Sequence, residues 1–355
     1  MAKVLMKGNE AIAEAAIRSG CRHYFGYPIT PQTEIAEYMA KSMPKINGLC
    51  LQAESEIAAI NMVLGAAASG KRVMTSSSSP GISLKSEGIS YIVGSDIPCV
   101  ILNVQRGGPG LGGIQPAQSD YYQATKSTSH GDMHVLVYAP ATIQEAAELT
   151  SKAFDLGDKY RMPAMILTDG ALGQMMEAVD FDKIVPGEAI DKPWATCGHG
   201  GKRKKNIINS LYIQPDELEK IVVERFKRYA EVQKNEVMYE EYMTDDAEIV
   251  IVAYGITARI CKAAAIMARQ QNIKLGLFRP ISLWPYPSAA LLNLAGKESV
   301  KHFLVSELNM GQMVDDVKVS INCSKPVSFY GRTGGMMPTP EELMKEIKKI
   351  KGGLN

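Results

Sequence analysis

Short apolar stretches alternate with longer helical patterns over the first 175 or so residues. Runs rich in β-branched and aromatic residues predict strands, whereas apolar positions spaced three and four apart predict helices. The predicted strands are residues 23–29, 49–53, 72–78, 98–105, 135–140 and 163–169. Strands that alternate with helices in this way are typical of a doubly wound α/β domain, in which helices cover both faces of a parallel sheet.

Capping residues indicate where the predicted helices begin. Asn9 is expected to cap the first helix, and Thr30 with Pro31 is expected to open the helix of residues 34–43. Thr30 would then lie between the carboxyl end of a strand and the amino end of a helix. Ligands bind at such junctions in open α/β sheets.

The pattern changes between residues 176 and 245. Pro, Gly and the basic run GKRKK lead into a charged helical stretch there, which we interpret as a partly helical connector. A second, shorter α/β pattern follows. We therefore expect a first domain at 1–175, a connector at 176–245 and a smaller domain at 246–355.

The composition is that of an ordinary globular protein. Hydrophobic residues make up 46% and charged residues 22%, and the formal net charge of +1 gives no reason to expect nucleic acid or a membrane as partner. The six cysteines include no CxxC pair, so we expect no metal site in this chain. The first residues lack the apolar core of a signal peptide, which predicts a cytoplasmic protein.

Two glutamates stand where a nearly all-apolar helix begins at residue 56, and we expect that helix to be buried. The helix dipole stabilises a carboxylate there by about 0.3–1 kcal/mol, and we interpret Glu54 in this way. Glu56, followed by IAAINMVLGAAA, resembles the glutamate helix of thiamine-diphosphate enzymes. In those enzymes a buried glutamate holds N1′ of the cofactor's pyrimidine ring and favours its imino tautomer. The resemblance implies this role for Glu56.

Four motifs follow one another in a defined order: Tyr27–Pro31 (YPITP), Gln52–Glu56, Thr75–Gly81 (TSSSSPG) and Arg106–Gly110 (RGGPG). With AYGITAR, LFRPISLWPYP and VSELNMGQM further along, they resemble the α-type subunit of 2-oxoacid:ferredoxin oxidoreductases. The chain is most similar to the branched-chain, 2-oxoisovalerate type and next to the 2-oxoglutarate type. The resemblance implies a pyrimidine-binding thiamine-diphosphate domain followed by a transketolase C-terminal-like α/β domain.

The resemblance also implies roles for the YPITP turn and the glycine-rich loop. Tyr27, Pro28 and Ile29 would contact the cofactor. Thr30 would donate a hydrogen bond near the reacting carbon or the substrate carboxylate, and Arg106 would bind that carboxylate with its planar guanidinium. Without the resemblance, Thr30 is a helix cap, and Arg106 is either an exposed loop arginine or an arginine that binds a carboxylate.

The Gly-Asp-Gly turn that carries the cofactor's metal in these enzymes is absent, and Thr168-Asp169-Gly170 is the nearest sequence to it. The chain would therefore hold only the pyrimidine half of the cofactor. The resemblance implies a β-type subunit that binds the pyrophosphate and Mg²⁺, and γ-type and ferredoxin-like subunits, with the [4Fe-4S] clusters also on partner chains. Ferredoxin would accept electrons and coenzyme A would be the co-substrate.

The implied activity is oxidative decarboxylation of a 2-oxoacid, 2-oxoisovalerate first, to an acyl-CoA and CO₂. Two alternatives stay open at this point. The same site could act on 2-oxoglutarate or pyruvate, because substrate length depends on a pocket that a partner chain can help to build. The chain could also be a non-catalytic scaffold or docking subunit, whose glutamate and arginine are ordinary capping and surface groups.

Overall fold

The computed structural model describes residues 3–188 and 190–354. Its largest sheet has seven strands, all parallel to their neighbours except one edge strand. In spatial order the strands are β12 (Ser282–Trp284), β6 (Leu136–Tyr138), β7 (Ala164–Asp169), β5 (Val100–Gln105), β4 (Val73–Ser77), β2 (His23–Gly26) and β3 (Leu49–Gln52). The antiparallel edge strand is β12, which comes from the C-terminal part of the chain.

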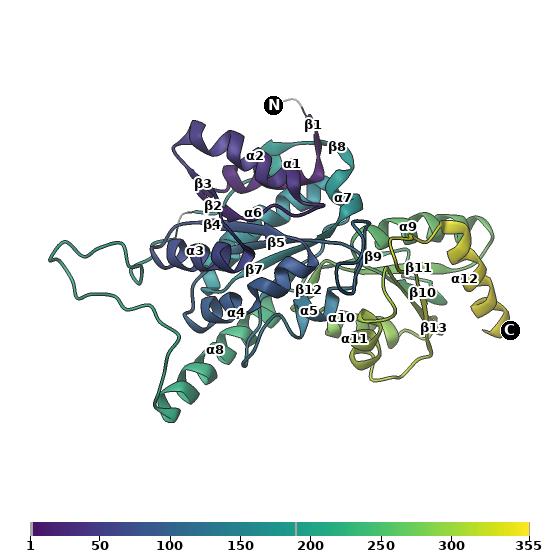
Figure 1. Cartoon of the computed structure of the whole chain (residues 1–355). Helices are drawn as coiled ribbons and strands as arrows, with labels where there is room; N and C mark the ends of the chain where they lie inside the picture. The colour runs from purple at the N-terminus through teal and green to yellow at the C-terminus, as the bar shows by residue number, and fades with distance from the viewer. Residues whose placement is uncertain (1–2, 189, 355) are drawn as a thin grey trace.

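Helices cover both faces of this sheet, as Figure 1 shows. On one face α1 (Gly8–Arg18), α2 (Thr33–Ser42) and α6 (Ile143–Tyr160) pack together, and on the other α3 (Glu56–Ala68) packs on α4 (Ser79–Gly94). Shorter elements complete this part: β1 (Val4–Lys7), η1 (Met43–Ile46), α5 (Tyr121–Thr125), α7 (Gly170–Gln174), β8 (Met176–Val179) and η2 (Phe181–Lys183). The predicted doubly wound α/β architecture is confirmed.

A second, five-stranded sheet forms most of the C-terminal part, on the right in Figure 1. Its strands in spatial order are β14 (Val327–Gly331), β13 (His302–Glu307), β10 (Ile249–Val252), β11 (Leu275–Pro280) and β9 (Tyr239–Tyr242). The accompanying helices are α9 (Gly255–Gln270), α10 (Ser288–Ala295), α11 (Met313–Ser320) and α12 (Pro340–Leu354). Helix α8 (Pro215–Asn235) precedes this sheet, and the segment before α8 extends away from the body of the molecule (Figure 1).

The capping roles predicted for Asn9 and Thr30 are wrong. Asn9 lies inside the first turn of α1, and its Nδ2 donates to the Pro31 carbonyl (2.8 Å) and to Glu34 Oε2 (2.9 Å). Gln32, not Thr30, is the N-cap residue of α2. Because Asn9 holds the Pro31 carbonyl, the YPITP turn lies against α1 and ends before the helix begins.

The expectation that the whole of α3 is buried is also wrong. Ile60 and Val63 pack into the core, but Ile57 on the outer side of the helix is 51% exposed. An apolar helix with one uncovered side is unusual on a lone chain and common at subunit interfaces. None of the helices in the two described ranges is long and apolar enough to cross a membrane.

Candidate active site

The predicted site residues lie at the carboxyl ends of the strands in the seven-stranded sheet. In the sheet, β3 lies on one side of β2, whereas β5 lies on the opposite side of β4. The direction in which successive strands are added therefore reverses between β2 and β4. Loops diverge at such a point and leave a crevice between them, where α/β proteins bind ligands. The YPITP turn, the start of α4 and the loop after β5 meet here.

Glu56 opens α3 beside this crevice and is only 5% exposed. The helix starts there because the Ser55 side chain caps it, accepting a hydrogen bond from the Ala58 amide (3.2 Å). Among the described residues, no hydrogen bond or ion pair involves the Glu56 carboxylate. A buried carboxylate without a protein partner is costly, and a ligand that donates a hydrogen bond would remove that cost.

Gly81 makes room for this carboxylate. A Cβ atom at Gly81 would overlap Ser77 Oγ and would lie 2.7 Å from Glu56 Oε1. The side-chain oxygens of Ser77 and Ser78 are buried without a hydrogen-bond partner in the described structure. The Glu56 carboxylate can accept a hydrogen bond from the polar edge of a planar heterocycle at this position. The residues therefore fit the aminopyrimidine of thiamine diphosphate.

The YPITP turn is anchored by a buried residue that the sequence reasoning missed. Gln32 accepts a hydrogen bond from Ser76 Oγ (2.5 Å) on β4 and donates to the Tyr27 carbonyl (3.3 Å). Tyr27, Pro28 and Thr30 are exposed and Ile29 is half-buried, so the turn presents its side chains outward. No sequence pattern could have revealed Gln32, because its partner belongs to a strand more than forty positions away.

Arg106 follows β5 and is only 8% exposed. Its Nη1 donates to the Thr30 carbonyl (2.9 Å) and its Nη2 to the Leu111 carbonyl (3.3 Å), while its buried Nε has no partner in the described structure. Both acceptors are neutral, so they leave the positive charge uncompensated and available to a carboxylate. The fold thus brings Arg106 and Thr30 together. No hydrogen bond or ion pair of the described structure joins either residue to Glu56.

A buried network beneath Arg106 was also missed by the sequence reasoning. Ser79 Oγ accepts from the Arg106 amide (3.1 Å) and donates to Asp120 Oδ2 (2.6 Å), which also accepts from Asn103 Nδ2 (3.0 Å). Burial raises the pKa of the Asp120 carboxyl. This network fixes the backbone of Arg106 to the first residue of α4. Its members come from three separate segments and carry no shared motif.

The C-terminal part of the chain holds the far end of the glycine-rich loop through Gln118, which is 1% exposed. Gln118 Oε1 accepts from Thr257 Oγ1 (2.8 Å) and from the Leu308 amide (3.1 Å), and its Nε2 donates to the Tyr254 carbonyl (2.9 Å). A cavity of about 600 Å³ lies between the loop and this part of the chain. Gly107–Gly110, Asp120 and Asn309 are among the residues that line it.

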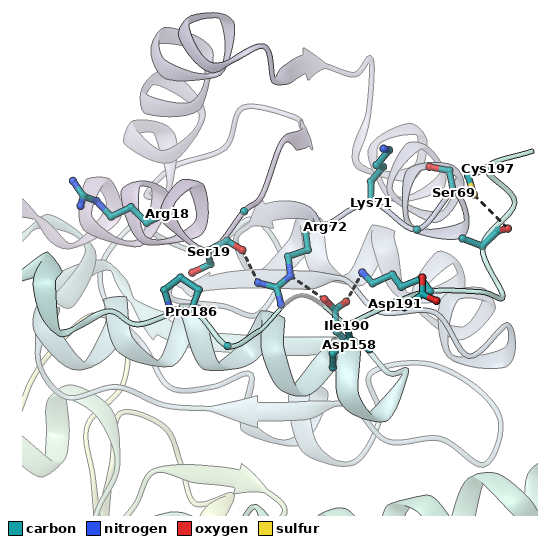
Figure 2. A pocket seen from close by; sticks show the side chains of 15 residues that line it. Arg18, Ser19, Ser69, Lys71, Arg72, Asp158, Pro186, Ile190, Asp191 and Cys197 are labelled. Atoms are coloured by element: carbon teal, nitrogen blue, oxygen red, sulfur yellow. Dashed lines mark hydrogen bonds and ion pairs between the residues drawn. The ribbon is translucent and has the colours of Figure 1, made fainter.

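A second cavity, of about 550 Å³, lies at the opposite, amino end of the strands (Figure 2). Arg72 there donates to Asp158 (2.8 Å), to Asp155 (2.7 Å) and to the Ser19 carbonyl (2.6 Å), and Lys192 pairs with Asp158 (2.5 Å). These cations and carboxylates compensate one another and tie the connector to α6. This cavity therefore lies where ion pairs hold the connector against α6, far from the predicted site residues.

Asp169, in the sequence nearest to Gly-Asp-Gly, is the N-cap of α7. Its Oδ1 accepts hydrogen bonds from the amides of Ala171 (2.8 Å) and Leu172 (3.1 Å). Burial raises its pKa to about 6 against the opposing effect of these amides. Within residues 3–188 and 190–354, no group of three or more His, Cys, Asp or Glu side chains could hold a metal ion.

The two α/β units give the protein the transketolase-like fold of thiamine-diphosphate enzymes. A split gene transketolase shares this fold with a TM-score of 0.59 over 97% of both chains, at 13% sequence identity. A 2-oxoglutarate:ferredoxin oxidoreductase from Magnetococcus marinus matches with a TM-score of 0.83 at 27% identity. That match covers 98% of this chain, which spans 65% of the other chain.

Two family models match the sequence. The model described as "Pyruvate flavodoxin/ferredoxin oxidoreductase, thiamine diP-bdg" covers residues 14–244, and "Pyruvate:ferredoxin oxidoreductase core domain II" covers residues 247–343. The chain therefore belongs to the pyruvate flavodoxin/ferredoxin oxidoreductase family, which confirms the resemblance inferred from the motifs.

Two relatives match over nearly their whole length. The chain is 46% identical to the ketoisovalerate oxidoreductase subunit VorB of Methanothermobacter marburgensis, with 100% of both chains covered. It is 33% identical to the 2-oxoglutarate synthase subunit KorA of Methanocaldococcus jannaschii, with 96% of this chain and 98% of the relative covered. Both relatives are named as subunits of larger enzymes.

Proposed function

We propose that this chain is the pyrimidine-binding subunit of a heteromeric oxidoreductase that converts 2-oxoisovalerate, coenzyme A and oxidised ferredoxin into an acyl-CoA, CO₂ and reduced ferredoxin. The observation that carries the proposal is the buried Glu56 carboxylate at the head of α3, which forms no hydrogen bond or ion pair in the described structure and faces Gly81. Such a group is suited to hold a proton at a ring nitrogen in a site with little water.

Glu56 would hold a proton at N1′ of the pyrimidine, and Gly81 would leave the space in which that ring approaches the carboxylate. Tyr27, Pro28 and Ile29 would line the ring from the neighbouring turn. When bound, thiamine diphosphate supplies the nucleophilic carbon for attack on the keto group and the electron sink that the loss of CO₂ requires.

Thr30 and Arg106 would orient the 2-oxoacid. The uncompensated guanidinium of Arg106 attracts the substrate carboxylate, and its contact with the Thr30 carbonyl sets the position of the threonine beside it. The Ser79–Asp120 hydrogen bond (2.6 Å) keeps the Arg106 backbone in place. A fixed orientation of the carboxylate aligns the adjacent keto carbon for reaction.

The branched-chain substrate is supported by the higher identity to VorB than to KorA. Among the described residues that line the cavity of about 600 Å³ beside the glycine-rich loop, none is Lys or Arg. An apolar side chain needs no second cation, whereas the distal carboxylate of 2-oxoglutarate does. The solved relative with 2-oxoglutarate bound keeps 2-oxoglutarate as the second candidate substrate.

A β-type partner subunit would bind the pyrophosphate and Mg²⁺, and γ-type and ferredoxin-like subunits would complete the complex with its [4Fe-4S] clusters. Large aliphatic side chains that this chain leaves uncovered support such an assembly: Ile57 on α3 is 51% exposed, and Ile207 and Ile213 before α8 are 81% and 80% exposed. We also propose that residues 1–175 and 246–355 act as two domains joined by a connector at 176–245.

The experiment is a dye-reduction assay of the complex co-expressed with its partner subunits, supplied in turn with 2-oxoisovalerate, 2-oxoglutarate and pyruvate. We expect kcat/KM to be highest for 2-oxoisovalerate. Glu56→Gln should remove most turnover and leave assembly intact, whereas the matched control Glu54→Gln, at an exposed position two residues earlier, should keep full activity. Unchanged turnover of the Glu56→Gln complex would reject the proposal in favour of a scaffold subunit.

A further inference from the structure

A lysine is completely buried next to the proposed cofactor site. Lys85 lies in the middle of α4 with 0% exposure, and its Nζ donates to Thr75 Oγ1 on β4 (2.7 Å). Burying an ammonium group is costly unless other groups compensate the charge. A single hydroxyl oxygen is a weak partner, so the role of this lysine depends on which charges lie around it.

Lys85 and Glu56 both lie along the contact between α4 and β4, which we call the seam. Thr75 and Ser77 are two apart on β4 and point to the same face of the sheet, while Gly81 and Lys85 are four apart and lie on the same face of α4. The Lys85 ammonium lies over Thr75 and Gly81 lies over Ser77, beside the Glu56 carboxylate. The two charges are therefore separated by roughly one strand repeat of about 7 Å.

Two ionisable groups act on Lys85 in this seam, Glu56 from α3 and the Cys99 thiol from the residue before β5. Burial raises the pKa of Cys99 to about 12, so this thiol is neutral at physiological pH. Burial lowers the pKa of Lys85 to about 8 and Glu56 opposes that change, so the lysine is mainly charged below that pH. Glu56 is thus the charge that Lys85 faces.

We propose that Lys85 is a positioning residue that acts through Glu56. As the buried counter-cation of Glu56, it sets how tightly the proton shared by Glu56 and the pyrimidine ring nitrogen is bound. This inference rests on the proposed function, because it requires Glu56 to hold the pyrimidine. The positive charge of Lys85 opposes a further positive charge on the ring. Removing the charge should therefore strengthen binding of that proton and move its release to higher pH.

The test measures hydrogen–deuterium exchange at C2 of bound thiamine diphosphate as a function of pH, by acid quench and NMR, in the complete complex. This readout needs no substrate and no turnover. In Lys85→Met, and equally in Lys85→Gln, we expect the midpoint of the exchange profile to rise by about one pH unit. Thr75→Val removes the hydrogen bond that stabilises the ammonium, so the midpoint should move in the same direction by a smaller amount.

A double variant shows whether Lys85 acts through Glu56. Glu56→Gln should slow C2 exchange by about 100-fold or more, and adding Lys85→Met should change that rate no further. Wild-type exchange in Glu56→Gln would overturn the proposed function itself. A loss of exchange in Glu56→Gln together with a wild-type midpoint in both charge-removing variants would overturn only the role of Lys85.

Both charge-removing variants leave the buried Glu56 carboxylate without its counter-cation, so they should be less stable than wild type. We expect them still to assemble when the cofactor, which donates a hydrogen bond to Glu56, is present. Size-exclusion chromatography and cofactor binding check this before the exchange measurement. If neither variant assembles with its partners, Lys85 is needed for the fold itself, and the assignment of a positioning role is rejected.

Discussion

Adding a single methyl group at Gly81, in the variant Gly81→Ala, tests the geometry around Glu56. It is the third residue of α4, and a Cβ atom there would overlap Ser77 Oγ and lie 2.7 Å from Glu56 Oε1. In Gly81→Ala the backbone needs no unusual torsion, so any loss of stability or turnover comes from crowding by the new methyl group. We expect the serine to rotate and the carboxylate to be displaced from the position in which it meets the cofactor.

The magnitude follows from two opposing effects. Overpacking costs about 1–3 kcal/mol, whereas alanine is favoured over glycine in a helix by about 1 kcal/mol. The free energy of unfolding should fall by roughly 0–2 kcal/mol. Turnover should fall by about 100-fold, because a displacement of about 1 Å at a reacting group has an effect of that size.

The matched control is Gly65→Ala on α3, where a Cβ atom would meet nothing within 4 Å. The same chemical change there should raise the free energy of unfolding of the free chain by about 0.5–1 kcal/mol. Urea unfolding of the isolated chain and dye reduction by the complex measure the two effects. If Gly81→Ala is as active and as stabilised as Gly65→Ala, the reasoning about Glu56 is refuted.

Three further predictions concern Arg106, Gln118 and Asp169. Arg106→Lys keeps the charge but loses the planar fork, so kcat/KM for the 2-oxoacid should fall by about 10- to 100-fold in steady-state assays. Gln118→Ala leaves several buried donors and acceptors of the C-terminal part unpaired, and urea unfolding should show a loss of about 2–4 kcal/mol. Burial raises the pKa of Asp169 to about 6, so the folded chain binds this proton more tightly than the unfolded chain, and stability should fall as pH rises from about 4 to 6. Asp169→Asn should remove up to about 3 kcal/mol of that dependence in unfolding measured across this range.

Each of these has a contrary outcome. An unchanged kcat/KM in Arg106→Lys would mean that the guanidinium does not meet the substrate carboxylate. A Gln118→Ala chain as stable as wild type would mean that other contacts hold the glycine-rich loop. Identical pH profiles of Asp169→Asn and wild type would show that the N-cap carboxyl titrates alike in the folded and unfolded chains.

Local patterns identified most of the elements around the site. The start of α3 at Glu56 and the strands that end before the site follow from the spacing of apolar residues, which acts over a few positions. The same reasoning failed for Asn9 and Thr30, because good capping residues also form hydrogen bonds to distant backbone groups. Asn9 reaches the Pro31 carbonyl, twenty-two positions away, and this contact outcompetes the cap.

The amino-acid sequence by itself determined that the chain forms two α/β units and that a glutamate stands at the head of an apolar helix, because periodicity and caps are local. Only the tertiary structure decided that Glu56 forms no hydrogen bond or ion pair with another described residue, that Lys85 lies near it between α4 and β4, and that Gln118 joins the loop to Thr257, 139 positions along the chain. Contacts of this kind depend on which segments the sheet order places side by side. That order brings together residues that are far apart in the sequence, and no local sequence pattern indicates that they are in contact.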